Sequence, residues 1–290
     1  MKEEILPLDE ANRTRVFADP VFWSVTLLGT TPLLIATLSS NELQLVAFAL
    51  FYAGLWAVIF KFFILQPTID RWSLWVGSLF FTGTIGIFFY GILYGFLPDF
   101  VGAAPFSGSF VVRLVGSIFV TGLSEEFCKS VPLLAYLAWK RSNAGPTTAL
   151  LIAVFSGLGF AAFENVDYGN RAIVDSMLHT RDSGASGLAF GVRSAMVNAM
   201  LRSISLVFCH GVWSGIVGHF ASTAVVLKRH VVASYLVDIV IAAVLHGTYN
   251  WLLSIQGTIA GLVVAVSFLL FYTYVARENT VEAKPIPAKK

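Results

Sequence analysis

Apolar runs long enough to cross a lipid bilayer recur along this sequence, and they restrict the possible folds more than any other feature. A hydrocarbon core of about 30 Å needs roughly 20 apolar residues in a helix. Eight runs approach or exceed this length, so we expect an all-α, polytopic membrane helix bundle of about eight transmembrane helices, forming one domain over residues 21–276. The runs lie at about residues 21–39, 44–64, 74–97, 111–138, 147–170, 194–227, 232–253 and 256–276.

The composition agrees with a chain that lies in a lipid bilayer. Hydrophobic residues make up 57% of the sequence and charged residues 12%, with a mean hydropathy of +0.77. These values exclude an ordinary water-soluble domain. The net charge is only +2, without a basic stripe interleaved with aromatics, which excludes nucleic acid as a partner. Cys128 and Cys209 lie in apolar runs and form no disulfide or CxxC pattern, so we interpret them as small buried residues.

The distribution of lysine and arginine predicts the orientation in the membrane. The first twenty residues lack the features of a cleavable signal peptide, so residues 1–20 are expected to be a cytoplasmic segment and the first span an anchor. With the N-terminus inside, most basic residues fall on the cytoplasmic side and both termini lie there. Residues 277–290, with two prolines and several charges, are expected to form a disordered cytoplasmic tail. The basic residues left on the other side are Arg113, Arg171, Arg181 and Arg193.

One polar connection, residues 171–193, is longer than the others. It contains glycine, serine and aspartate and lies on the external side in the predicted topology. Such a composition is typical of mobile loops. We therefore expect a flexible external loop here, and a candidate lid or entry gate for a substrate.

Four of the predicted spans carry polar side chains deep within the apolar sequence. Even on a lenient insertion scale, each charge at the centre of a membrane helix costs about 2.5–3.5 kcal/mol. Intramembrane residues of this kind usually mark a functional site. They are Glu125, Glu126 and Lys129 in the fourth span, Glu164 in the fifth, His210 and Ser214 in the sixth, and His246 and Asn250 in the seventh.

These polar residues are predicted to lie at one depth in the membrane. Counted from the cytoplasmic end of each helix at 1.5 Å per residue, Glu125 lies about 20 Å deep and His246 about 21 Å. Glu164 and His210 both lie about 26 Å deep. The spans over residues 111–253 therefore bring them into one layer, slightly outside the membrane midplane.

The same count separates other polar residues from this layer. Arg202 is about 37 Å from the inner end, at the external interface, where an arginine that reaches toward water is ordinary. Asp167 and Tyr168 are expected at the outer rim. Asp238, about 9 Å deep, is close to the level of Lys129 at about 14 Å, so a structural ion pair between them is one interpretation.

Within 125-EEFCK-129, the helical rotation of 100° per residue places Lys129 between Glu125 and Glu126. One lysine neutralises one glutamate and leaves the other available for chemistry. A purely structural ion cluster is the alternative. That alternative does not require a third carboxylate and two histidines at the same depth.

Both histidines begin the same short pattern, 210-HGVWS-214 and 246-HGTYN-250. The spacing of four residues places Ser214 and Asn250 on the same helix face as the histidine before each of them. Alone, each histidine would more often be an interhelical hydrogen-bonding residue. The glycine after each histidine serves either access to the ring or close helix packing.

The chemistry that these side chains allow is amide hydrolysis. A carboxylate in apolar surroundings is a stronger base than in water and can activate a water molecule. His246 with Asn250, or His210, would donate hydrogen bonds to the oxyanion of the intermediate. Two histidines and a carboxylate also resemble a catalytic zinc site. Because HExxH is absent, we prefer a metal-free glutamate mechanism, with zinc as the alternative.

The ordered set EExxK at 125–129, FxxxE at 160–164, HGxxS at 210–214 and HGxxN at 246–250 resembles the PrsW family of intramembrane proteases. That family is related to the type II CAAX prenyl endopeptidases and the CPBP/Abi group. The motifs cover about residues 121–250. The resemblance implies a glutamate-dependent protease, without a required cofactor, in the bacterial cytoplasmic membrane. It would make the extracytoplasmic-side cut in a single-span membrane protein such as an anti-sigma factor.

The resemblance also assigns roles to residues. Glu125 and Glu126 would activate water, with Glu125 as the base and Lys129 as their positioner. His210 and His246 would bind or polarise the scissile carbonyl, and Asn250 would support them.

This chain departs from the CAAX endopeptidase pattern, since it has EExxK where those enzymes have EExxxR and Glu164 where they have a histidine. Prenylated substrates are therefore less favoured, and Glu164 is a second acid, a ligand or a structural partner. A proton- or ion-coupled transporter is the alternative from another class, because such proteins also use deep glutamates, histidines and lysines. The inverted repeats and broken helices that many transporters show are not evident in the sequence.

Overall fold

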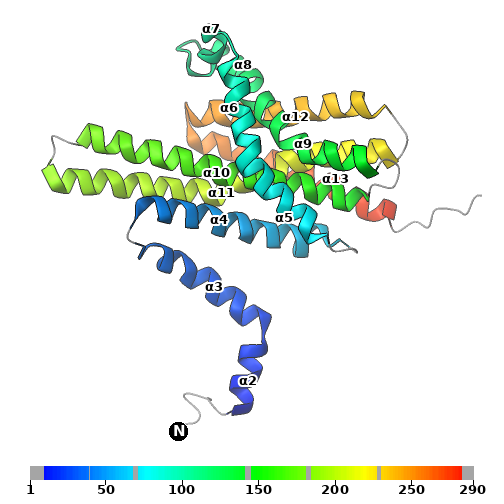
Figure 1. Cartoon of the computed structure of the whole chain (residues 1–290), viewed down its shortest axis with the longest axis horizontal. Coiled ribbons are helices and arrows are strands. Elements are labelled where there is room, and N and C mark those ends of the chain that lie inside the picture. The colour runs from blue at the N-terminus through cyan, green and yellow to red at the C-terminus, as the bar shows by residue number, and fades with distance from the viewer. Residues whose placement is uncertain are drawn as a thin grey trace, which may run out of the picture.

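The computed structural model describes residues 10–38, 40–67, 71–140, 145–180, 184–226 and 230–282, and the regular structure in these ranges is entirely helical. Figure 1 shows the arrangement of the helices. The α-helices are α2 (Glu10–Ala18), α3 (Pro20–Ile35), α4 (Asn41–Ile59), α5 (Trp72–Phe81), α6 (Ile87–Gly95), α7 (Asp99–Gly102), α8 (Phe110–Gly116), α9 (Leu123–Lys140), α10 (Pro146–Thr180), α11 (Gly184–Val226), α12 (Val231–Leu253) and α13 (Gly257–Glu282). The π-helical segments are η1 (Phe60–Leu65), η2 (Thr82–Gly86) and η4 (Ser117–Gly122), and η3 (Ala104–Phe106) is a 3₁₀ turn.

Six helices of the described chain are long and apolar enough to cross a membrane. They correspond to six of the eight expected spans, and they make the protein a multi-pass membrane protein. The other two expected spans differ. The first corresponds to α3, which has only 16 residues. The fourth corresponds to the continuous run α8–η4–α9, which carries Glu125, Glu126 and Lys129 in its middle. The total of eight spans and the side of each terminus stay predictions.

The long antiparallel pair α10 and α11 forms the centre of the bundle. Residues 149–162 of α10 are buried on every side, which explains why this stretch is apolar all round instead of along one stripe. Helices α4 and α5 pack against α10, while α12 and α13 pack against α11. The core therefore surrounds the middle of α10 and α11.

Helices α2 and α3 lie apart from this bundle (Figure 1). Contact between α3 and α4 is confined to the end of α3, where Ile35 belongs to the same buried cluster as Phe48 and Tyr52. Further along α3, Leu28 and Leu33 are exposed. Exposed leucines on an apolar helix are suited to contact with lipid.

The expected mobile loop at residues 171–193 is wrong. Helix α10 continues to Thr180 and α11 begins at Gly184, so only residues 181–183 of this connection lie outside the described chain. The physical reason is packing, because Ile173 of α10 and Ala195 of α11 are buried with Leu45 of α4. As a result α10 and α11 extend as a helical hairpin beyond the rest of the bundle (Figure 1).

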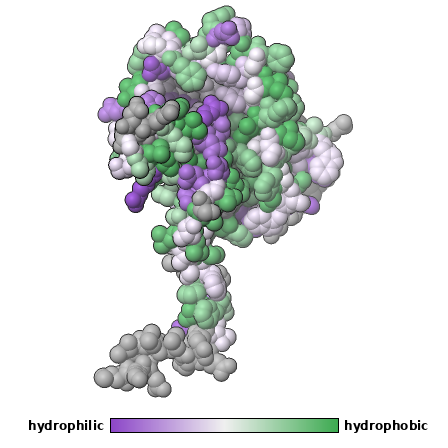
Figure 2. Space-filling view, turned by 60° about the vertical axis from the view of Figure 1, so that its left-hand side comes forward, coloured by the Kyte–Doolittle hydropathy of each residue, from purple (hydrophilic) through white to green (hydrophobic). Residues whose placement is uncertain are grey.

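The chain termini fall partly outside the described residues. Residues 277–282 belong to α13, so the expected disordered tail is wrong for this part, and residues 283–290 lie outside the described chain. Residues 1–9 of the expected cytoplasmic segment lie outside it as well. In Figure 2, hydrophilic surface gathers in one band on the face turned forward, and most of the remaining visible surface is apolar or neutral.

Candidate active site

Four neighbouring helices supply the polar cluster. Glu125 and Glu126 occupy the first turn of α9, directly after η4. Glu164 lies in α10, His210 in α11 and His246 in α12. All five come together in the core, so spans four to seven of the sequence prediction meet as expected.

Glycines permit the helix crossings that bring these side chains together. A Cβ atom added to Gly157 of α10 would lie 2.2 Å from the carbonyl oxygen of His210. At Gly247 of α12 it would lie 2.4 Å from the Cα atom of Ile118 in η4. Real Cβ atoms do not approach so closely, so larger residues would separate these helices. The glycine that follows His246 therefore serves close packing.

Lys129 lies between the two adjacent glutamates. Its Nζ atom is 2.9 Å from Oε1 of Glu126 and 3.3 Å from Oε2 of Glu125, and its side chain is 0% exposed. Glu125 and Glu126 are almost fully buried as well. The other interpretation, an ion pair between Lys129 and Asp238, is wrong: Asp238 is buried elsewhere on α12, and its Oδ2 atom has no hydrogen-bond partner in the described chain.

Glu126 holds His246 in a fixed orientation. Nδ1 of His246 lies 3.0 Å from Oε1 of Glu126, which also binds Lys129, and the hydroxyl group of Ser214 donates to Oε2 of Glu126 at 3.4 Å. A carboxylate beside Nδ1 favours the tautomer with its proton on Nδ1. The Nε2 lone pair of His246 then faces the other side of the ring, toward Oε2 of Glu125 at 3.6 Å.

His210 and Glu164 form a second histidine–glutamate pair, next to that of His246 and Glu126. Nε2 of His210 lies 3.6 Å from Oε2 of Glu164. The ring centroids of His210 and His246 are 4.7 Å apart, and Trp213 stacks on His246 at 4.5 Å. One ligand atom each from Glu125, His210 and His246 lies within 4.8 Å of the others.

Five buried atoms of the cluster have no hydrogen-bond partner among the described residues: Oε2 of Glu125 and of Glu164, Nε2 of His246, and both ring nitrogens of His210. Buried polar atoms in proteins are nearly always satisfied, and those that are not usually bind a water molecule or an ion. The cluster also contains three carboxylates but only one ammonium group. These carboxylate side chains offer oxygen ligands to a cation.

The donor set fits zinc. Imidazole nitrogen and carboxylate oxygen are common zinc ligands, with bonds of about 2.0–2.2 Å, which separates tetrahedral ligand atoms by roughly 3.3–3.5 Å. The 3.6 Å between Nε2 of His246 and Oε2 of Glu125 is close to that separation. A carboxylate on the second nitrogen, as Glu126 is on His246, is the usual support of a zinc-binding histidine.

A comparison with protein families matches residues 70–276 to the group described as PrsW family intramembrane metalloprotease. The match covers well over half of the chain. The chain belongs to the PrsW family. Comparisons with curated proteins and with solved structures find no match. The PrsW region begins before α5 and ends within α13, so it contains every residue of the cluster, and the protein is an intramembrane protease.

The remaining predicted residue of this PrsW protein, Asn250, lies one turn beyond His246. Its side chain is half-buried, and no hydrogen bond links it to the cluster within the described chain. Conversely, two residues outside the predicted site lie next to it. Asn165 follows Glu164 directly, and Arg202 donates to its side chain at 3.3 Å. The place of Arg202 at the external interface of the membrane stays a prediction.

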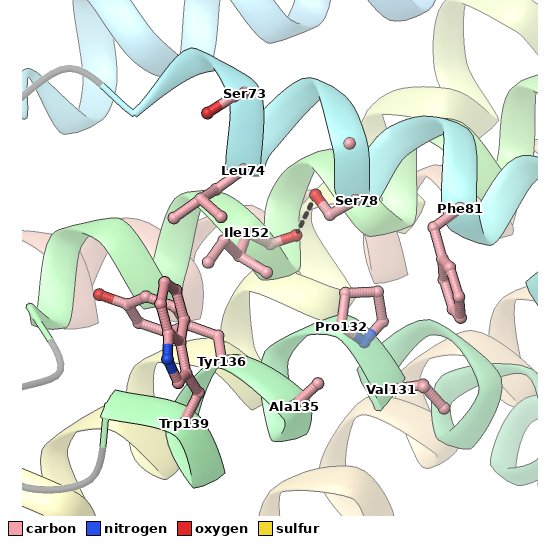
Figure 3. A pocket seen from close by; sticks show the side chains of 11 residues that line it. Ser73, Leu74, Ser78, Phe81, Val131, Pro132, Ala135, Tyr136, Trp139 and Ile152 are labelled. Atoms are coloured by element: carbon pink, nitrogen blue, oxygen red, sulfur yellow. Dashed lines mark hydrogen bonds between the residues drawn. The ribbon is translucent and has the colours of Figure 1, made fainter.

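One groove of the PrsW region lies outside the cluster. It is a cavity of about 350 Å³ between α5 and α9. Figure 3 shows the side chains that line it, among them Ile152 of α10. Ser78 lines it and donates to the carbonyl oxygen of Ile152 at 3.1 Å, and Tyr136 and Trp139 close one end. None of its lining residues belongs to the cluster, so the groove is not the catalytic centre.

Proposed function

We propose that this protein is a metal-dependent endopeptidase of the bacterial cytoplasmic membrane. It hydrolyses one peptide bond of a single-span membrane protein, near the extracytoplasmic side. The observation that supports this function best is the convergence of three buried ligand atoms, one each from Glu125 of α9, His210 of α11 and His246 of α12, which lie within 4.8 Å of one another. The family description as a metalloprotease supports it as well.

In this proposal His210, His246 and Glu125 hold a zinc ion. Zinc in such a site acts as a Lewis acid toward the scissile carbonyl and makes water a better nucleophile. This proposal prefers zinc to the metal-free glutamate mechanism that the sequence favours, and the chelator experiment below decides between them. The three ligands come from separate helices, so no short motif such as HExxH contains them.

Glu164 is the general base in this arrangement. Its side chain is 15% exposed, whereas those of Glu125 and Glu126 are 3% and 0% exposed. It is therefore the carboxylate that water and substrate reach first. Oε2 of Glu164 would accept the proton of the attacking water and later deliver it to the departing amine. This differs from the role of base that the resemblance gave to Glu125.

Glu126 and Lys129 act as positioning residues. Glu126 accepts hydrogen bonds from Lys129, His246 and Ser214, so neither of its oxygens is left to act as a base. Lys129 offsets the charge of both glutamates and fixes their side chains. Together they keep Nε2 of His246 directed into the site.

The experiment uses the purified full-length protein in mild detergent and a panel of single-span membrane proteins with an epitope tag on each side of the helix. We expect bound zinc by elemental analysis, cleavage of at least one panel member, loss of cleavage with a chelator and recovery with Zn²⁺. Glu125→Gln should lose both zinc and activity. Glu164→Gln should keep the zinc but cleave at least about 100-fold more slowly, the usual size of a lost general base.

Arg171→Gln is the matched control, because Arg171 is 73% exposed on the same helix as Glu164 and forms only a surface ion pair with Asp167. Cleavage that is insensitive to chelators in a zinc-free protein would contradict the metal site and return the role of base to Glu125. Proton-driven uptake in liposomes without cleavage of any panel member would favour a transporter instead. A requirement for a prenylated cysteine in the substrate would favour the CAAX-type activity.

A further inference from the structure

Asn165 is a buried amide that lacks half of its hydrogen bonds. It is 2% exposed and directly follows Glu164 in α10. Its Oδ1 atom accepts a hydrogen bond from Nε of Arg202 at 3.3 Å. Its Nδ2 group has no partner among the described residues. A buried donor of this kind costs free energy unless a ligand satisfies it.

Arg202 is held beside this amide by two contacts. Its Nε group binds Asn165, and its Cζ atom lies 4.4 Å above the ring of Tyr168. The side chain is half-buried, and it is close enough to interact electrostatically with both Glu164 and His210. Since Nε is used by Asn165, the outer edge of the guanidinium group remains to bind another acceptor.

The two residues lie at the more exposed edge of the cluster. Tyr168, one turn beyond Glu164, is 46% exposed, and Glu164 is the most exposed carboxylate of the site. A substrate that reaches Glu164 would therefore pass Asn165 and Arg202. Both residues present N–H donors, so what binds there carries oxygen acceptors.

We propose that Asn165 and Arg202 form a substrate-binding subsite that donates hydrogen bonds to main-chain carbonyl oxygens of an extended segment beside the scissile bond. This inference rests on the proposed function. An unwound segment of a membrane helix loses its internal hydrogen bonds, and in hydrocarbon its carbonyl groups need new donors. Asn165 and Arg202 supply such donors next to the catalytic base.

The local charge favours a carbonyl over an acidic side chain. Arg202 binds the side chain of the residue that follows Glu164, so its charge lies close to that carboxylate. Glu125 and Glu126 are buried in the same cluster, next to His246. A substrate carboxylate would add negative charge to this group, whereas a neutral carbonyl would not.

Asn165→Asp is the sharpest test of the subsite. It keeps an oxygen for Nε of Arg202, removes the Nδ2 donor, and adds a carboxylate whose charge pairs with that guanidinium group. With a single-span panel member that the wild type cleaves, we expect KM to rise about 5- to 10-fold, the effect of one lost hydrogen bond of about 1–1.4 kcal/mol, while kcat changes less. Arg202→Met should have an effect of the same kind, and Arg171→Gln should have none.

A binding measurement separates this inference from the proposed function. The panel members are titrated onto Glu125→Gln protein, with and without Asn165→Asp, and Kd is measured. We expect Asn165→Asp to weaken binding about 5- to 10-fold even where nothing is cleaved. Unchanged binding, or no binding of any panel member, would overturn the subsite. Cleavage by the wild type would then still support the proposed function.

Changes in the substrate decide whether the subsite binds main-chain carbonyl groups or side-chain carboxylates. In the panel member, Asp and Glu residues near the cut are replaced by Asn and Gln. If Asn165 and Arg202 bind main-chain carbonyls, the effect of Arg202→Met stays the same with the substituted substrate. An effect that disappears with the acidic residues would overturn main-chain binding and assign recognition to a side-chain carboxylate.

Discussion

At the scale of single residues, Lys129 determines whether the buried glutamates can be tolerated. Its ammonium group is fully buried and contacts Glu125 and Glu126, and it also lies 4.8 Å from the ring centroid of Phe160. Removal of one partner from a buried ion pair leaves an uncompensated charge, which costs about 3–5 kcal/mol. Lys129 is therefore needed for folding as well as for the geometry of the site.

Lys129→Met should lower the free energy of unfolding by about 3–5 kcal/mol for this reason. Thermal unfolding in mild detergent measures the change. Lys140→Met, at the other end of α9, is the control, since Lys140 contacts the exposed ring of Trp139 and should have a much smaller effect. Combining Lys129→Met with Glu126→Gln should recover part of the stability. A fully stable Lys129→Met protein would contradict the electrostatic role.

The meeting of Glu125, His210 and His246 was predictable from the sequence, but their partners were not. The regular rise of a helix predicts that these residues share a level, and the structure brings their ligand atoms within 4.8 Å of one another. The rise does not say which faces of two helices pack together. The contact of Arg202 with Asn165 was therefore not predicted.

At the scale of helices, the π-helical segment η4 sets the position of the first turn of α9. Its wider turn lies directly before the two glutamates and against α12. Two close approaches fix this crossing, because a Cβ on Gly247 would clash with Ile118 and a Cβ on Gly122 would lie 2.6 Å from the carbonyl oxygen of Ala243. Such π segments are frequent at functional sites.

Deletion of Phe119, an exposed residue of η4, should abolish cleavage. The deletion turns one side of the helix by about 100° relative to the other, so the contacts of Ile118 and Gly122 with α12 cannot both persist. Phe119→Ala keeps the register and should retain activity. Cleavage of a panel member measures both variants. An active deletion variant would show that η4 does not position the glutamates.

The helical structure of the connection between α10 and α11 could not be predicted from its composition. Its glycine, serine and aspartate suggested a loop, but Ile173 and Ala195 pack with Leu45 from another span. Tertiary packing of this kind overrides local composition. The π segments were not predicted either, because a single extra residue in a turn leaves no mark in an apolar run.

At the scale of the whole molecule, the predicted topology determines which connections between helices can be labelled from outside the cell. With both native cysteines replaced, single cysteines at Gly108 and Gln256 should react with an impermeant reagent from outside the cell. Cysteines at Arg71 and His230 should react only after permeabilisation. Asp19→Cys should also react only after permeabilisation if α3 crosses the membrane. All five positions are exposed in the structure, so burial would not mask the result.

Labelling of Arg71→Cys and Gly108→Cys from the same side would contradict the crossing by α5 and α6. Labelling of Asp19→Cys from outside would exclude α3 as a span and reduce the number of crossings. The sequence predicted the spans well where a run is long and free of charge, as in residues 257–276 of α13. It was less decisive for α3, because a run of 16 helical residues is shorter than the bilayer core requires.

The hairpin of α10 and α11 limits which proteins can reach the catalytic centre. From Glu164 to Thr180 the helix rises about 24 Å, and α11 accompanies it. In the predicted orientation the end of this hairpin lies on the external side, so we expect it to keep a folded extracellular domain at roughly that distance from the cut. A substrate would need a leash of about seven extended residues between its domain and its scissile bond. Proteins whose folded domain begins directly at the membrane surface would be excluded sterically, whatever the sequence around their scissile bond.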